Sequence, residues 1–104
     1  MRALFIVLPL LLAHQVTGAG EVRGKDAFDK WCVHCHGEGP GNAGTLRLAI
    51  DRGAEKALLE GRKDLTAAYI KLIVRSGKNQ MPGYRLLEIN DEDLAYLADY
   101  LSSQ

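Results

Sequence analysis

The sequence CVHCH occupies residues 32–36. Cysteines at positions i and i+3 lie on the same face of one helical turn, so Cys32 and Cys35 can each form a thioether to one vinyl group of a porphyrin. His36 follows directly, which brings an imidazole nitrogen toward the iron. The spacing therefore predicts that one c-type haem is attached through Cys32 and Cys35 and that His36 is an axial ligand.

Two cysteines with this spacing also occur in other settings. A thioredoxin-like redox couple needs a βαβ context, and no parallel-strand pattern is found near Cys32. A zinc site needs four ligands, whereas this chain has only two cysteines. A structural disulfide of an exported protein is the third alternative. The histidine directly after the second cysteine favours haem attachment over all three.

The first residues have the layout of a secretory signal peptide. Arg2 is followed by an apolar run over residues 3–13 and then by polar and small residues up to Ala19. A membrane span needs about 20 apolar residues, so this run, which also contains Pro9, is too short. We expect cleavage after Ala19, or after Gly18; an uncleaved anchor lying in the membrane interface is the alternative.

Cleavage after residue 19 of the 104-residue chain would leave residues 20–104 as one domain of 85 residues with no membrane span. This domain has 12 basic and 13 acidic side chains and therefore a formal charge of −1. Basic runs are missing from its sequence, which argues against a nucleic-acid partner. A domain of this size buries a thin core, and a large planar apolar cofactor would supply its centre.

Three segments have apolar residues at helical spacing: residues 24–31, 66–76 and 90–101. Thr66 and Asn90 are suited to cap the second and third of them, and three acidic residues follow Asn90 in the favoured first turn. No pair of strands is indicated elsewhere. The pattern predicts an all-α domain.

A glycine on the apolar face of the first segment costs about 1 kcal/mol against alanine. Gly24 is explained if another helix crosses it at close range, with Tyr96 or Tyr100 of the last segment as the residue that packs there. Fraying at the start of the helix is the alternative explanation.

Residues 37–44 are rich in glycine and predict a loop around the haem edge. Pro40 in this loop is a candidate to present its carbonyl to the non-ligating nitrogen of His36, although an ordinary turn proline explains it equally well.

Residues 45–63 show no clear periodicity, and we expect a loop that wraps the haem. Leu46 and Leu48 are candidate apolar contacts within it. A short helix is expected over residues 54–60, closed by Gly61.

Met81 is the only methionine after removal of residues 1–19. Pro82 forces it into an extended loop, from which a thioether can reach inward. A loop methionine is often core filler. The other histidine of the processed chain, His34, lies two residues from His36 on the same helix and cannot reach the opposite haem face. We therefore predict His36 and Met81 as the two axial iron ligands.

Together these segments resemble the small class I bacterial cytochromes c. The resemblance implies an all-α cytochrome c fold whose N- and C-terminal helices cross around a covalently attached haem, with Gly24 and Phe28 meeting Leu97 and Tyr100. Together with the signal peptide it implies a periplasmic electron-transfer protein. It rests on Gly24 and Phe28, on residues 32–36, on Val74, Arg75 and Gly77 before Met81 and Pro82, and on residues 91–101.

Residues 58–62, 68–71 and 73–77 are also similar to the small cytochrome subunits of p-cresol methylhydroxylase and of related alkylphenol or eugenol hydroxylases. This resemblance implies that the chain takes electrons from a covalently bound flavin on a large partner and passes them to a downstream acceptor. Residues 37–57 depart from p-cresol methylhydroxylase, being longer and richer in glycine, which bears on the phenolic substrate more than on the subunit role.

The expected function is single-electron transfer at a haem with both axial positions filled, so the chain alone is not an enzyme. Lys30, Lys78 and Arg85 are candidates to dock an acidic partner, or they form an ordinary solvated face. Alternatives are a diffusible carrier to a terminal oxidase, a ligand-binding or peroxidatic haem protein in which Met81 is displaced, and a haem-free thiol–disulfide protein.

Overall fold

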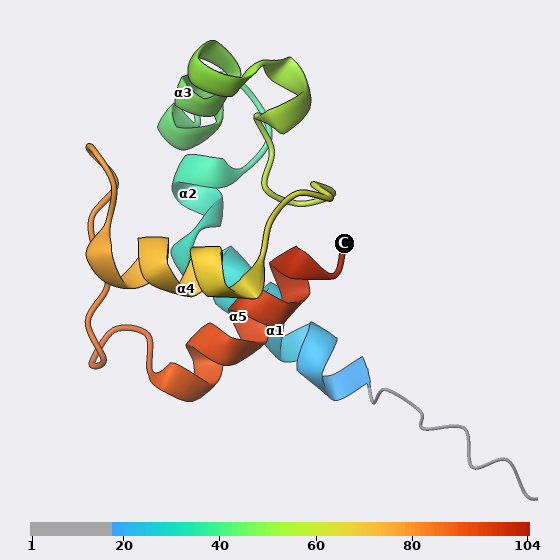
Figure 1. The fold of residues 1–104 in the computed structure, drawn as a ribbon, viewed down its shortest axis with the longest axis vertical. Coiled ribbons are helices and arrows are strands. Elements are labelled where there is room, and N and C mark those ends of the chain that lie inside the picture. The colour runs from blue at the N-terminus through green and yellow to red at the C-terminus, as the bar shows by residue number, and fades with distance from the viewer. Residues whose placement is uncertain (1–17) are drawn as a thin grey trace, which may run out of the picture.

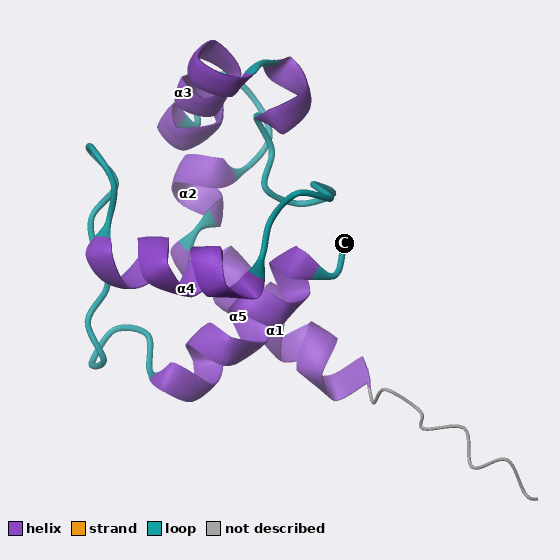
Figure 2. Ribbon diagram, in the orientation of Figure 1, coloured by secondary structure: helices purple, strands orange, loops and turns teal. Residues whose placement is uncertain are grey.

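The computed structural model describes residues 18–104, which form short helices joined by loops (Figures 1 and 2). The only extended pairing in this range is an isolated bridge between Lys78 and Met81. The predicted all-α class is therefore confirmed. The elements are α1 (Gly18–Trp31), α2 (Val33–His36), α3 (Ala43–Arg52), the single 3₁₀ turn η1 (Ala54–Lys56), α4 (Ala67–Ser76) and α5 (Asp91–Ser102).

Helix α1 begins at Gly18, earlier than the Gly24 start expected from the sequence. Its first two turns lie against α5: a Cβ at Gly20 would lie 3.4 Å from the Tyr96 ring, and Arg23 forms ion pairs with the first turn of α5. These tertiary contacts, rather than helix propensity, explain the extra turns. The predicted signal peptide lies outside the described residues except for Gly18 and Ala19, and it stays a prediction.

Helices α1 and α5 cross at Gly24, as the sequence predicted (Figure 1). A Cβ at this position would lie 2.5 Å from the Tyr96 carbonyl oxygen and would overlap the Tyr100 Cβ, so only glycine allows the approach. Phe28, one turn further along, is 0% exposed and packs near the Tyr100 ring. The choice of Tyr100 over Tyr96 for this contact is confirmed, because the Tyr96 ring lies instead beneath the Arg23 guanidinium.

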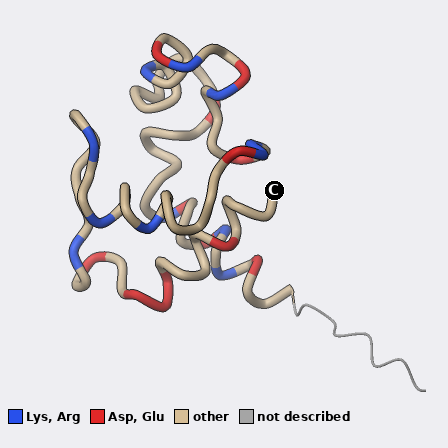
Figure 3. Tube along the Cα trace, in the orientation of Figure 1, with Lys and Arg blue, Asp and Glu red and all other residues tan. Residues whose placement is uncertain are grey.

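Helix α4 packs against α5 and carries Ile70 and Val74 into the common core. Both predicted caps form: Thr66 Oγ1 accepts from the Tyr69 N–H at 3.2 Å, and Asn90 Oδ1 accepts from the Asp93 N–H at 2.8 Å. Each cap satisfies an N–H that has no partner within its own helix. Figure 3 shows the acidic first turn of α5 as a continuous red segment.

The expectation of a loop over residues 45–63 is wrong for its first half, where α3 forms. The alternation of apolar residues at positions 46, 48 and 50 is not a helical pattern, although the segment is a helix. An i,i+4 ion pair lies on this helix, with Arg47 Nε 2.8 Å from Asp51 Oδ2. Gly53, with φ +96°, ends it. The helix expected over residues 54–60 is also wrong in extent, because only the turn η1 forms there. Gly61, with φ +85°, closes a later turn instead.

Candidate haem site

The two cysteines lie on one continuous turn at the junction of α1 and α2. The Cys32 carbonyl accepts from the N–H groups of Cys35 at 3.1 Å and of His36 at 2.8 Å, which keeps the three side chains within one helical turn. Both thiols are free; Cys32 is half-buried and Cys35 is exposed. Burial raises the pKa of the Cys32 thiol to about 12, whereas the attacking thiol of a redox couple has a lowered pKa.

His36 is the last residue of α2, and its ring is largely enclosed. Nδ1 is buried and has no hydrogen-bond partner among the described residues. Burial also lowers the pKa of His36, which favours the neutral imidazole that binds metals. The expected bond to the Pro40 carbonyl is therefore not confirmed. The neutral imidazole is the form that could bind an iron through its other ring nitrogen, Nε2.

The chain after His36 packs closely against the His36 imidazole ring. A Cβ at Gly44 would lie 2.9 Å from His36 Nδ1 and 2.7 Å from the Cys35 carbonyl oxygen, so α3 approaches α2 through a glycine. Thr45 Oγ1 donates to the Gly37 carbonyl at 2.7 Å. The roles of Gly44 and Thr45 were not predicted from the sequence, because a loop was expected where α3 begins.

Met81 is held by a tight backbone turn after α4. The N–H of Lys78 donates to the Met81 carbonyl at 3.1 Å, and the Met81 N–H donates back at 3.0 Å. Asn79 adopts φ +55° and Gly77 adopts φ +69°, and a Cβ at Gly77 would lie 2.6 Å from the Met81 carbonyl oxygen. Met81 is half-buried and lies outside the buried cluster of the described residues, which argues against its being core filler.

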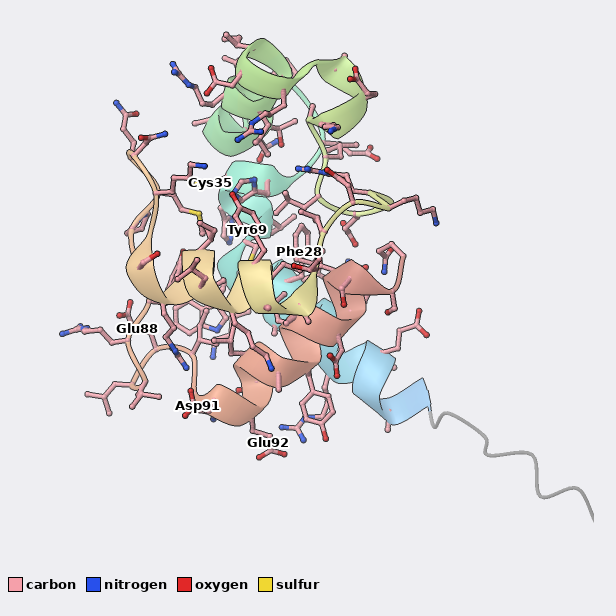
Figure 4. The ribbon with its side chains drawn as sticks, viewed as in Figure 1. Phe28, Cys35, Tyr69, Glu88, Asp91 and Glu92 are labelled. Carbon is pink, nitrogen blue, oxygen red and sulfur yellow. The ribbon has the colours of Figure 1, made fainter. Side chains whose placement is uncertain are left out.

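Apolar side chains remain uncovered on the elements around this site. Leu46 and Ile50 of α3 are exposed, as are Tyr69 and Leu72 of α4. In Figure 4, Tyr69 extends from α4 on the side where α2 and Cys35 lie. A large planar apolar group placed there would remove this surface from water, which is the arrangement a haem requires. The residues present therefore fit a haem.

A zinc site fits less well. Among residues 18–104, no three histidine, cysteine, aspartate or glutamate side chains are grouped closely enough to hold a metal ion. Two cysteines that could form thioethers to a porphyrin, together with one imidazole and one methionine that could bind its iron, are instead the side chains that a c-type haem uses.

Residues 20–101 match the protein family described as "Cytochrome C oxidase, cbb3-type, subunit III". The chain belongs to the cytochrome c family. Members of this family are electron carriers with haem c as their cofactor, so the expectations of haem c and of a carrier rather than an enzyme are confirmed at this level.

This cytochrome is also 40% identical over 84 residues to the "4-cresol dehydrogenase [hydroxylating] cytochrome c subunit" of Pseudomonas putida. The match covers 77% of the present chain and 58% of that protein, so the chain spans somewhat more than half the length of the curated relative. Two solved structures of p-cresol methylhydroxylase, one determined at 2.5 Å and one with substrate bound, match with a TM-score of 0.53 and 40% identity. They cover 77% of this chain and 90% and 89% of the matched chains, respectively.

The three cations expected to dock a partner each have a neighbour within the cytochrome. Lys30 Nζ lies 5.0 Å from the centre of the Trp31 ring, and Lys78 Nζ donates to the Tyr69 hydroxyl at 3.4 Å. Arg85 Nε lies 3.1 Å from Glu88 Oε1. No helix of the described residues is long and apolar enough to cross a membrane.

Proposed function

We propose that this cytochrome is an exported, periplasmic single-electron carrier with one haem attached through Cys32 and Cys35 and ligated by His36 and Met81. The observation that carries the proposal is the combination of two features. One is a neutral, enclosed His36 on the same turn as both thiols, and the other is Met81 on a separate, preformed turn outside the core.

When bound, the haem supplies a one-electron couple at its iron. Cys32 and Cys35 tether it on a turn rigidly continuous with α1, because the Cys32 N–H donates to the Phe28 carbonyl at 2.8 Å. His36 and Met81 would hold the iron through an imidazole nitrogen and a thioether sulfur, which would leave no position on it for a substrate. Methionine, a soft neutral ligand, favours Fe(II) and raises the reduction potential relative to a second histidine.

We further propose that the electron donor is a flavin-containing dehydrogenase or hydroxylase subunit that oxidises an alkylphenol, and that a downstream acceptor takes the electron on. The 40% identity to a cytochrome subunit named for 4-cresol dehydrogenase supports this role. An exposed apolar turn also supports a stable complex with a partner protein, because the side chain of Leu86 is 59% exposed and that of Leu87 is 94% exposed. Adjacent uncovered leucines are typical of an interaction surface.

The turn that presents these leucines is rigid. The N–H groups of Glu88 and Ile89 both donate to the Arg85 carbonyl at 3.0 Å, and Glu88 Oε1 accepts from the Arg85 N–H at 3.1 Å. Ile89 is fully buried beneath the turn. A turn fixed in this way loses little conformational entropy when a partner covers it.

A diffusible carrier to a terminal oxidase is the second candidate, and the family description, which names an oxidase subunit, favours it. Affinity capture of the tagged cytochrome from its native host separates the two. Co-elution of a flavin-containing chain supports the subunit role, whereas elution of the cytochrome alone contradicts it.

Haem attachment is tested separately by acid–acetone extraction, which removes only non-covalent haem. Colour that stays with the wild-type protein and is lost in a Cys32→Ser, Cys35→Ser double variant supports the two thioethers. Extraction of all haem from the wild type contradicts them.

A further inference from the structure

The Arg75 side chain lies at the end of α4, where it reaches across the chain that follows. Its Nη1 donates to the Tyr84 carbonyl at 3.2 Å and to the Ile89 carbonyl at 2.7 Å. Its Nη2 donates to Asp91 Oδ1 at 2.7 Å. One guanidinium thereby connects the end of α4, the segment after Met81 and the first residue of α5.

The segment that Arg75 holds is the one that carries Met81. It leaves α4 at Gly77, passes through the Lys78–Met81 turn and returns to α4 at Gly83 and Tyr84. Figure 1 shows this stretch as the loop that follows α4. A Cβ at Gly83 would lie 2.6 Å from the Arg75 carbonyl oxygen, and the Tyr84 N–H donates to the Val74 carbonyl at 2.7 Å. Both ends of the stretch from Gly77 to Tyr84 are therefore fixed on the last turn of α4.

The hydrogen-bond partners of the Arg75 guanidinium all lie after Met81 in the chain, not before it. Tyr84 is anchored at its backbone N–H by Val74 and at its hydroxyl, which donates to the Trp31 carbonyl at 3.2 Å. Its carbonyl, like that of the buried Ile89, accepts from Arg75. Loss of a charged donor from a carbonyl that is shielded from water costs free energy. Removal of the guanidinium should therefore loosen the chain between Tyr84 and Ile89.

We propose that Arg75 is a positioning residue for Met81: it closes the segment of residues 77–90 against α4 and so keeps the methionine thioether in place. The proposal rests on the proposed ligation by Met81. Arg75 does not touch the haem site; it acts through the backbone that carries Met81.

The test is a titration of the oxidised holoprotein with imidazole, which competes with the methionine for the sixth position. The wild type is compared with Met81→Ala, Arg75→Gln, Arg75→Lys and Arg23→Gln. Arg23 is the matched control because it also forms ion pairs with the first turn of α5, to Glu92 and Asp93. If Arg75 merely stabilised α5, Arg23→Gln would have the same effect.

Arg75→Gln is expected to tighten imidazole binding about tenfold or more, the size that the loss of one or two charge-assisted bonds implies. Arg75→Lys keeps the charge but not the fork of donors, so its affinity should lie between those of Arg75→Gln and the wild type. Arg23→Gln should stay within about twofold of the wild type.

A second measurement separates positioning from general stability. The near-infrared methionine-to-iron band of oxidised Arg75→Gln should disappear at a lower urea concentration than the helical circular dichroism, whereas both should disappear together in Arg23→Gln. Equal behaviour of the two variants in both measurements overturns the proposal. If Arg75→Gln does not fold, the same comparison with Arg75→Lys decides.

Failure of the Met81 assignment would look different. In that case the wild type would lack the near-infrared band and Met81→Ala would bind imidazole no more tightly than the wild type. If Met81→Ala does tighten binding and Arg75→Gln does not, only the role of Arg75 is wrong.

Discussion

Gly24 and Tyr100 are in direct contact where α1 and α5 cross, and the Tyr100 hydroxyl donates a hydrogen bond to the Glu60 carboxylate. Tyr100 therefore joins three parts of the chain: the helix that leads into the cysteines, the last helix, and the loop before α4. Burial, together with the bond to Glu60, raises the pKa of Tyr100 far above its usual value, so the hydroxyl remains a donor at any ordinary pH.

Substitution of Gly24 by alanine should separate the two helices. The new methyl group would meet the Tyr96 backbone oxygen at 2.5 Å, and backbone cannot turn aside as a flexible side chain can. We expect the free energy of unfolding to fall by about 1–3 kcal/mol, measured by urea denaturation. Gly20→Ala is the control, since its Cβ would meet the Tyr96 ring at 3.4 Å, an ordinary contact. Equal loss in both variants would contradict the crossing argument.

Substitution of Met81 by alanine should abolish the near-infrared band of the oxidised protein while the haem stays attached through Cys32 and Cys35. The reduction potential should fall, because the soft thioether that favours Fe(II) is lost. Absorption spectroscopy and potentiometric titration measure the two effects. An unchanged spectrum and potential would show that Met81 is not a ligand.

The Asp64–Arg62 pair should make stability depend on pH in acid. The Arg62 guanidinium holds the pKa of the Asp64 carboxyl well below its usual range of about 4. The folded state then binds fewer protons than the unfolded state, so this contribution is complete above about pH 5 and is lost as the pH falls below 4. The free energy of unfolding of Asp64→Asn, measured by urea denaturation, should therefore fall less between about pH 5 and pH 3 than that of the wild type. An identical pH dependence in both proteins would rule this out.

Substitution of Leu86 and Leu87 together by glutamine should weaken the association with a flavoprotein partner. Leu87 is 94% exposed, so the folded cytochrome itself should lose little stability. Surface plasmon resonance against the co-purified partner should show an affinity lower by about tenfold or more. Val22→Gln is the control, because Val22 is as exposed as Leu86, at 59%, but lies on α1. Unchanged affinity in the double variant would exclude this turn from the interface.

The parts of the fold that follow local rules could be predicted from the sequence. Thr66 and Asn90 cap helices because their side chains satisfy nearby N–H groups. Gly24 indicated the helix crossing because a residue without a side chain on the apolar face of a helix allows another helix to approach closely. The motif at residues 32–36 indicated the candidate site because few chemistries use that spacing, and Met81 is the only methionine of residues 20–104.

What could not be predicted depends on tertiary contacts. Helix α3 was missed because Leu46 and Ile50 stay exposed, so its apolar residues do not mark a buried face. The first turns of α1 exist because Arg23 and Gly20 contact α5, which no local pattern encodes. The hydrogen bonds of Arg75 could not be predicted either, since its acceptors lie 9 to 16 residues further along the chain.

The turn that carries Cys32, Cys35 and His36 is held by local backbone hydrogen bonds, from Cys32 to Phe28 and from Cys35 and His36 to Cys32. Met81 lies instead on a segment that is held at Tyr84 by the Val74 and Trp31 carbonyls, which are distant along the chain from Met81 or belong to another helix. A haem held by two thioethers stays on the chain when the tertiary structure is lost. Recovery of the site after unfolding is then an intramolecular event, independent of protein and haem concentration. Under the proposed ligation, the carrier could lose Met81 from the iron and regain it many times without ever having to find its cofactor again.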